Sequence, residues 1–430
     1  MAYWFHRNPL KATAPVDFEL KHVAREARAV NICSELKVRR ERLLRNFTNA
    51  SSDLALMDEE FTKYMELLYG FLFCFGDTSD AESKLCSLIV FKWSSSMLGT
   101  TSHEINNAWF EVLNMCLNMA IWLTKHAAWV SAKDNVAESE AKIVHTCLRR
   151  AAGLFTFVSQ NCDKIPGASS IKGSDFDSAV LSAYVNQCMA EAEEVTMARA
   201  IELNHAPLLI SSLAQETTRL FLAADKYLEQ QNQSIFGKWR KYLQLKAELY
   251  TAYAYAYYGQ HLQSEHKAGD AIRIYNEGIT FYKKTCDLCS KYAKTTGPGV
   301  AARLDKHLFY RRVEPILKQN IEKAERENNM IYHEIVPKEC PRLESKSVEG
   351  LMKPEIYGLP KSDEVWNTAV YASFDTSKSL LSLIFTSVLG SSKKEVPKVI
   401  QSRRDLPPIK EAKIYETDRD PDNRSGCVVS

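Results

Sequence analysis

Apolar residues recur at helical spacing through most of the first 330 residues. The segments with this spacing cover 26–50, 53–76, 102–130, 136–162, 174–203, 207–229, 234–264, 266–292 and 304–329. Apolar positions three and four residues apart lie on one face of an α-helix, whereas strict alternation is typical of a half-buried strand. Because alternating segments are scarce, the pattern predicts an all-α fold.

Residues 1–20 lack this periodicity and contain Pro9 and Pro15. Proline has no backbone N–H to donate, so it is excluded from helix interiors and from central strands. We therefore expect either an irregular arm or a small N-terminal β element in this segment.

The stretch 185–228 predicts two helices separated by a break at 204–207. Proline at 207 suits a first helical turn, where its missing N–H has no intrahelical partner anyway. The second helix carries two neighbouring apolar stripes, which are Leu209, Leu213 and Leu220, and Ile210, Ala214, Thr217 and Phe221. Two stripes indicate either a helix buried on most sides or one that presents leucines to a partner, and periodicity alone favours burial.

The segment 239–282 resembles a tetratricopeptide helix pair, the building block of a helical solenoid. Small residues let two helices approach closely, and these are Ala252, Ala256, Gly259, Gly269 and Ala271. Larger side chains fill the remaining space, namely Trp239, Tyr250, Tyr257, Ile272 and Tyr275. Such arrays usually present long grooves to peptide ligands.

The periodicity fades after residue 335. A segment rich in Pro, Lys, Glu and Ser predicts an extended strap over the helical body. Residues 376–426 are mostly polar and too poor in apolar groups to fold alone, so we expect a flexible tail there. The exception is LLSLIFTSVLG at 380–390, which is too short to span a bilayer. It could dock back on the body, lie in a membrane interface or end the fold, and docking back is favoured.

Composition excludes several classes of protein. The net charge of +2 gives no general attraction to nucleic acid, and no run is long and apolar enough to cross a membrane. The N-terminus has no signal-peptide pattern. The 11 cysteines are scattered and odd in number, which indicates free thiols in a reducing compartment. Cys286 and Cys289 lie inside a helical pattern, so we interpret their CxxC spacing as structural.

Catalytic patterns are missing from the chain. There is no P-loop, dinucleotide-binding, nucleophile-elbow or HExxH motif, and the sequence HEINN at 103–107 lacks the second histidine. We predict a non-enzymatic protein without a cofactor or a metal site.

Cys427 begins the sequence Cys-Val-Val-Ser at 427–430, which matches a CaaX box. A serine in the last position favours a farnesyl group. One prenyl chain anchors a protein only weakly, so a second attachment to the membrane is expected. The tail is a poor polybasic patch, and the second attachment is therefore predicted to be a partner protein already at the membrane.

Glu138 and Lys142 are spaced four residues apart with the acid first, which is the favourable order on a helix. Such a pair is commonly a solvated surface pair of small energetic value. It is also suited to the edge of a binding groove, and the spacing alone does not decide between the two.

Several long stretches resemble the BRO domain family. They are WFHRNPLKATAPVDF at 4–18, FKWSSSMLG at 91–99, EAEEVTMARAIELNHAP at 191–207, KWRKYL and YTAYAYAYYG within 238–259, and ENNMIYHEIVP at 327–337. The resemblance covers residues 1–375 as a BRO domain, with the CaaX box at 427–430 matching the short members of the family.

This resemblance implies an extended, banana-shaped helical domain with a tetratricopeptide-like core. It also implies a groove for the C-terminal amphipathic helix of ESCRT-III subunits, the charged multivesicular body proteins. Two apolar groove positions fall on Leu209 and Leu213, and the flanking acid–base pair falls on Glu138 and Lys142.

Three further positions follow from the resemblance. A groove position that is aromatic elsewhere in the family falls on Thr196, and the neighbouring Met197 is expected to compensate. Tyr332 matches a tyrosine that is phosphorylated in a relative, although half-buried packing is the favoured interpretation here.

The implied function is that of a farnesyl-anchored ESCRT-III adaptor on the cytoplasmic face of the nuclear envelope or of endosomes, also present in cytosol. We expect a monomer that binds no nucleic acid. The alternative is a prenylated helical scaffold for another client, with the ESCRT-III groove weakened at Thr196.

Overall fold

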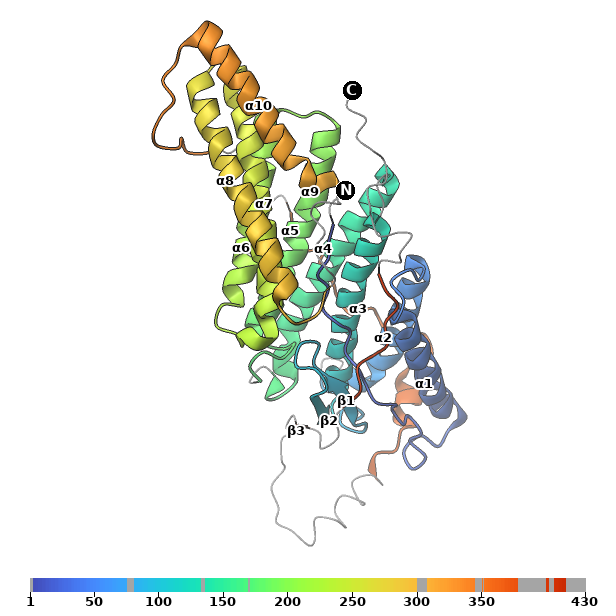
Figure 1. The fold of residues 1–430 in the computed structure, drawn as a ribbon. Helices are drawn as coiled ribbons and strands as arrows, with labels where there is room; N and C mark the ends of the chain where they lie inside the picture. Colours follow the sequence, from blue (N-terminus) through green and yellow to red (C-terminus); the bar gives the residue numbers. More distant parts are fainter. Residues whose placement is uncertain are drawn as a thin grey trace.

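The computed structural model forms one elongated helical body (Figure 1). It describes residues 3–75, 81–132, 136–168, 171–299, 308–344, 350, 352–377, 400–401 and 406–414. Helices make up most of these residues, so the all-α prediction is confirmed. Each long helix packs on the next one along the chain, from α3 (Ala108–Ser131) to α8 (Ala268–Lys294), and α10 (Val313–Glu327) then lies on α8.

The helices up to residue 327 match the predicted periodic segments to within a few residues at most ends, whereas the short helix at 368–372 was not predicted. They are α1 (Ala27–Phe47), α2 (Leu54–Leu72), α3 (Ala108–Ser131), α4 (Glu138–Asn161), α5 (Ser178–Glu202), α6 (Pro207–Tyr227), α7 (Gln233–Ser264), α8 (Ala268–Lys294), α9 (Leu308–Arg311), α10 (Val313–Glu327) and α11 (Thr368–Ala372). Side-chain caps fix several starts: Asp53, Asn107, Asp177 and Asn232 each accept a hydrogen bond from the first turn.

A small antiparallel sheet joins β1 (Phe91–Ser94), β2 (Ser102–Ile105) and β3 (Ile400–Gln401). The prediction that a helix begins at residue 102 is therefore wrong. Residues 102–105 pair with β1 in the register Phe91 to Ile105, and the helix begins only after the Asn107 cap. The β element also lies outside residues 1–20, because the described part of that segment makes just one isolated bridge, Thr13 to Trp93.

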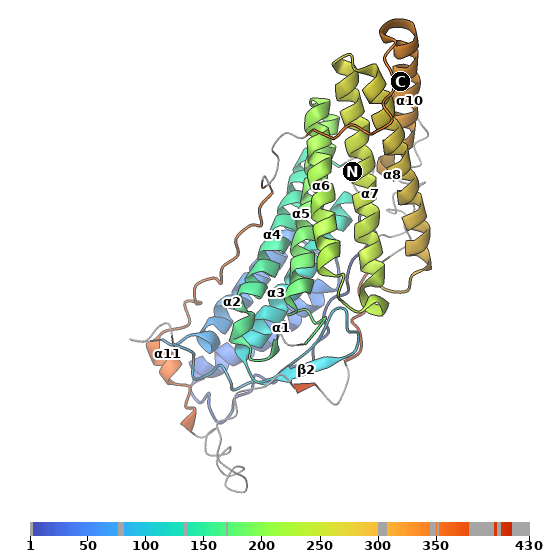
Figure 2. The same ribbon diagram turned by 90° about the vertical axis from the view of Figure 1, so that its left-hand side faces the viewer.

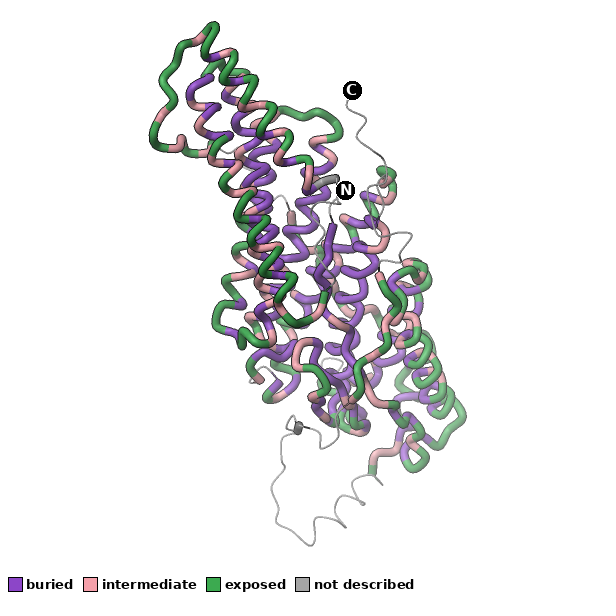
Figure 3. Tube along the Cα trace, in the orientation of Figure 1, coloured by how far each residue is buried: buried purple, intermediate pink, exposed green. Residues whose placement is uncertain are grey.

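The N-terminal residues form the predicted arm, which passes through the core (Figure 3). The Trp4 indole donates a 2.6 Å hydrogen bond to Glu194, and the Arg7 guanidinium forms a bidentate pair with Glu191 at 2.9 Å. Buried charges need such partners to offset the loss of hydration. The arm consequently ties α5 to the centre of the molecule.

The helix pair α7 and α8 confirms the close approach predicted from small residues. A Cβ on Gly259 would lie 2.3 Å from the Tyr275 ring, so only glycine allows this contact. Gly269 is small for a different reason, since its Cβ would lie 2.8 Å from the Ile335 carbonyl oxygen. That glycine makes room for the strap rather than for a neighbouring helix.

The strap predicted after residue 335 crosses the helices on one side of the body (Figure 2). The Gln215 amide of α6 donates to the Glu344 carbonyl at 3.1 Å, and the Glu355 N–H donates to the Arg149 carbonyl of α4 at 3.1 Å. The strap ends at α11, where the Asp375 N–H donates to the Val23 carbonyl at 3.0 Å.

The expectation of a flexible tail over 376–426 is wrong for residues 406–414. The Ala412 N–H donates to the Thr48 carbonyl at 2.8 Å, and the Glu411 carboxylate accepts from the Leu10 N–H at 2.8 Å. Glu411 also forms an ion pair with buried Lys125. The apolar segment 380–390 and the motif at 427–430 lie outside the described residues.

Candidate functional site

A groove runs between α4, α5 and α6, which lie side by side in Figure 2. Its volume is about 630 Å³. The residues that line it are Glu138, Ala141, Lys142, His145, Thr146, Val195, Thr196, Arg199, Ala200, Leu203, His205, Leu209 and Leu213. Five of the predicted site residues therefore meet here: Glu138, Lys142, Thr196, Leu209 and Leu213.

The floor of the groove is apolar because small or aliphatic side chains from all three helices meet there. Leu213 is 3% exposed, and Ala141, Val195 and Ala200 are also buried. Leu209 lies one helical turn earlier and is half-buried. A ligand that entered the groove would cover Leu209, whereas Leu213 is already largely protected from water.

The two apolar stripes of α6 have different roles. Ile210, Ala214, Thr217 and Phe221 are at most 2% exposed and belong to the core. The other stripe turns toward the groove at its N-terminal end, through Leu209. Burial, favoured by periodicity, is correct for the first stripe and also for Leu213 and Leu220 of the second. In the second stripe, half-buried Leu209 stays accessible to a partner.

The rim of the groove carries a preformed set of charges. The Lys142 ammonium lies 2.8 Å from the Glu138 carboxylate, and the Arg199 guanidinium lies 3.9 Å from it. The hydrogen bond from Lys142, with the positive charges of Lys142 and Arg199, lowers the pKa of Glu138. Glu138 also begins α4, where the helix dipole favours an anion. The carboxylate is thus held ionised at the groove edge.

Thr196 and Met197 face in different directions. Thr196 is half-buried in the groove, with its hydroxyl 3.4 Å from the Ala192 carbonyl oxygen. Met197 is fully buried and does not line the groove, because consecutive helical residues point about 100° apart. The expectation that Met197 would replace a missing aromatic is wrong, and the groove keeps a small side chain at this point.

Sequence reasoning missed several residues of the rim. The missed residues that line the groove are His145 and Thr146 on α4, Arg199 on α5, and Leu203 and His205 directly after α5. Leu203 is 60% exposed, which is unusual for a large apolar residue. Projecting each helix from Glu138 and Thr196 would have found most of them, since they follow at three- and four-residue steps.

His145 connects the groove to the strap. Its Nε2 atom lies 3.2 Å from the Met352 sulfur, and burial, followed by the charge of Arg149, lowers the pKa of the imidazole. The strap thus contacts one of the side chains that shape the groove.

Tyr332 lies away from the groove, in the π-helical turn Asn328–Tyr332 after α10. Its hydroxyl lies 2.8 Å from the His266 Nδ1 atom, and the side chain is only partly exposed. The structure does not bring this tyrosine together with the other predicted site residues.

Among the described residues, no cluster of His, Cys, Asp or Glu is arranged to hold a metal ion. Their cysteines are all free thiols, including Cys286 and Cys289. Over the same residues, no helix combines the length and apolarity that crossing a bilayer requires.

Comparisons with known proteins give the class of this molecule. The model of the BRO1-like domain family matches residues 9–405. The chain therefore belongs to the BRO1-like domain family, which agrees with its helical fold and with the resemblance read from the sequence.

Within the family, the chain is similar to proteins named BROX. It is 43% identical to the BRO1 domain-containing protein BROX homolog of Caenorhabditis elegans, with 100% of each chain covered. It is 42% identical to BRO1 domain-containing protein BROX of Homo sapiens, with 88% of this chain and 92% of that protein covered. The fold matches the solved ALIX BRO1 CHMP4C complex at a TM-score of 0.64 and 18% identity, over 85% of this chain and 98% of that one.

Proposed function

We propose that this protein is a non-enzymatic adaptor that binds the C-terminal amphipathic helix of an ESCRT-III charged multivesicular body protein in the groove between α4, α5 and α6. The observation that carries the proposal is the meeting of Leu209 and Leu213 with the Glu138–Lys142 pair in one cavity of about 630 Å³. The solved complex of a relative's BRO1 domain with CHMP4C supports the class of partner.

An amphipathic helix suits this groove because its anchors recur at three- and four-residue steps on one face. The apolar floor would receive the anchors, and the charged rim would contact the polar flanks. Covering roughly 200 Å² of apolar surface corresponds to about 5 kcal/mol before the cost of ordering the partner. The expected affinity is micromolar, which suits reversible recruitment by an ESCRT-III filament that presents many copies of the helix.

Membrane attachment forms the second part of the proposal. Farnesyl transfer would join the Cys427 sulfur to C1 of farnesyl diphosphate and release diphosphate. A single lipid holds a membrane weakly, and a groove-bound filament on the same membrane adds a second contact. We place this activity at the cytoplasmic face of the nuclear envelope or of endosomes, with the protein acting as a monomer and without nucleic acid.

The main alternative is a prenylated scaffold for a different client. Thr196 favours this alternative, because it leaves a small polar side chain on the groove floor where an aromatic anchor is expected. A partner with a larger apolar side chain at the matching position would fill that space.

The test is the affinity of the full chain for a peptide of an ESCRT-III C-terminal helix, with a scrambled peptide as the control. The full chain is needed because residues 406–414 pack on the body. Micromolar binding of the native peptide alone supports the adaptor function. Equal or absent binding of both peptides would contradict it while leaving the family assignment intact.

Membrane attachment is tested separately with the farnesylated chain and Cys427→Ser. The first is expected to co-sediment with vesicles that carry an ESCRT-III filament, and the second to lose most of that binding. Equal co-sedimentation would show that the lipid has no part in the attachment.

A further inference from the structure

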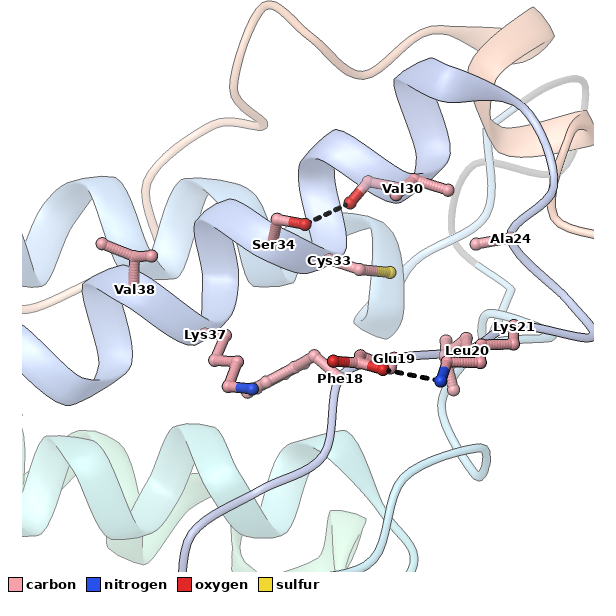
Figure 4. A pocket seen from close by; sticks show the side chains of 10 residues that line it. All are labelled: Phe18, Glu19, Leu20, Lys21, Ala24, Val30, Cys33, Ser34, Lys37 and Val38. Carbon is pink, nitrogen blue, oxygen red and sulfur yellow. Dashed lines mark hydrogen bonds and ion pairs between the residues drawn. The ribbon is translucent and has the colours of Figure 1, made fainter.

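A second cavity, of about 410 Å³, lies between α1 and the loop before it (Figure 4). Phe18, Glu19, Leu20, Lys21 and Ala24 contribute from the loop. Val30, Cys33, Ser34, Lys37 and Val38 contribute from α1. It shares no residue with the groove on α4, α5 and α6, so the proposed helix binding leaves it unused.

The cavity has the character of a site for an apolar ligand. Its wall is formed by Phe18, Ala24 and Cys33, which are buried, and by Val30 and Val38, which are 44% and 49% exposed. Its volume falls within the range of about 300–1,000 Å³ typical of small-molecule pockets. Its edge carries two exposed lysines, Lys21 and Lys37, and one exposed acid, Glu19, which pairs with Lys21 at 3.1 Å. An apolar chain attached to an acidic or neutral polar segment would match both features.

The C-terminal part of the chain comes close to this cavity. The Ala412 N–H donates to the Thr48 carbonyl, directly after α1, and Ile414 packs on the core. From Thr48, the helix rise of about 1.5 Å per residue places Val38 about 15 Å away and Val30 about 27 Å away. The thirteen residues from Ile414 to Cys427 span at most about 45 Å, so Cys427 can reach the cavity.

The charges along this route are complementary. Residues 415–426 carry four acids, Glu416, Asp418, Asp420 and Asp422, against the two bases Arg419 and Arg424. At the cavity edge and from there toward Thr48, α1 exposes Lys37, Arg42 and Arg45, together with one exposed acid, Glu41. Arg42 also pairs with Glu60 at 2.8 Å. Oppositely charged segments attract each other over about a Debye length, so this face of α1 favours the tail.

We propose that the farnesyl group on Cys427 docks in the cavity between α1 and residues 18–24 of its own chain. This inference rests on the proposed farnesylation of Cys427. The docked lipid is withheld from membranes, and its release exposes the anchor. The protein thereby remains soluble until a partner or a membrane competes for its tail.

The direct test uses full chain whose Cys427 carries a photoreactive diazirine analogue of farnesyl. Irradiation without vesicles is expected to cross-link the lipid to peptides within residues 18–38. Cross-links confined to other peptides, or spread evenly over the surface, would overturn the proposal.

A cavity-filling variant provides a functional test. Val38→Trp places a large side chain in the cavity, and Val90→Trp is the matched control because Val90 is 58% exposed and does not line it. With both variants farnesylated and equally stable, Val38→Trp is expected to bind vesicles several-fold more than wild type. Val90→Trp is expected to match wild type. Equal vesicle binding by all three proteins would overturn the proposal.

A third measurement separates this inference from the function on which it rests and from a rival occupant. S-farnesylcysteine methyl ester is added to the Cys427→Ser chain, with and without the Val38→Trp substitution. Binding to the first protein and not to the second supports the cavity as the lipid site, whatever the result for peptide binding at the helix groove. Binding that appears only after deletion of 380–390 would identify that apolar segment as the occupant and overturn the proposal. A chain that farnesyltransferase leaves unmodified would remove the lipid function while leaving peptide binding at the groove intact.

Discussion

The carbonyl oxygen of Glu355 lies against Gly153 so closely that a Cβ there would be 1.7 Å from it. This contact seats the strap on α4, where the Glu355 N–H also donates to the Arg149 carbonyl at 3.1 Å. About two turns earlier on α4, His145 contacts Met352 of the strap and lines the groove. The position of the strap and the shape of one groove wall are therefore linked through a single helix.

Gly153→Ala is expected to displace the strap. Backbone shifts of this kind cost about 1–3 kcal/mol, which outweighs the gain of roughly 1 kcal/mol from alanine in a helix. Denaturant unfolding of the full chain measures the difference. Gly237→Ala on α7 is the control, because its Cβ meets nothing within 4 Å and the change should be neutral or stabilising. Equal effects of the two substitutions would show that the strap contact has no energetic importance.

Leu209→Asp is expected to weaken binding of the ESCRT-III helix peptide by more than tenfold, with little change in thermal stability. The side chain is half-buried and accessible at the groove. An aspartate there would lose its hydration when an apolar anchor covered it, but it would not enter the core. Isothermal titration and thermal unfolding give the two readouts. Leu222→Asp is the matched control, because Leu222 is 50% exposed on another face of α6. If both variants bind as wild type does, the groove is not the peptide site.

Leu213→Asp is expected to lose both binding and stability. Leu213 is 3% exposed, and a charge buried without a partner destabilises a fold strongly. Leu213→Ala should lower the free energy of unfolding by about 2–5 kcal/mol. Denaturant unfolding measures the free energy of unfolding of both variants. A fully stable Leu213→Asp protein would contradict a structural role for this leucine in the core.

Exchanging the rim charges is expected to change binding and leave stability nearly constant. The side chains of Glu138 and Lys142 are 62% and 75% exposed, and exposed pairs contribute little to folding. Glu138→Lys combined with Lys142→Glu should lower the affinity for the peptide at low salt. The loss of affinity should become smaller at higher salt, because salt screens the charges of the rim. Titrations at two ionic strengths test this, and a loss of equal size at both would contradict an electrostatic role.

Glu193 is expected to make stability depend on pH. Its carboxylate is buried, neither oxygen has a hydrogen-bond partner among the described residues, and burial, followed by the charge of Glu216, raises its pKa from 4.5 to about 7. The native state then holds a proton that the unfolded chain releases, so stability falls as pH rises from about 4.5 through 7. The shift corresponds to about 3 kcal/mol at most.

Glu193→Gln should reduce that dependence, because the amide does not titrate. The slope that remains is expected from groups such as Glu194, whose pKa burial also raises to about 7. Denaturant midpoints at pH 5, 6, 7 and 8 measure the slope. Glu202→Gln, an exposed position at the end of the same helix, should keep the wild-type slope. An unchanged slope in Glu193→Gln would show that another group carries the pH dependence.

The positions of the long helices could be predicted from the local spacing of apolar residues along the chain. The period of apolar residues is a property of neighbouring positions, and capping residues such as Asn232 mark helix starts within the same few residues. The strap could also be predicted, because proline-rich segments without periodicity do not form helices. Residues 102–105 were predicted as helix because the spacing of apolar residues does not show that another segment, here β1, pairs with them.

Which distant segments contact each other could not be predicted from the sequence and was seen only in the tertiary structure. The groove exists because α4, α5 and α6 converge, and only their packing shows that Thr196 faces it while Met197 faces the core. Residues 406–414 carry too few apolar groups to fold alone, yet Ile409 and Ile414 pack on the core. Hydrogen bonds and an ion pair with Thr48, Leu10 and Lys125 also hold the segment on the body. Periodicity reports which face of one element is apolar, whereas burial depends on which other element covers that face, and this is set by the whole fold.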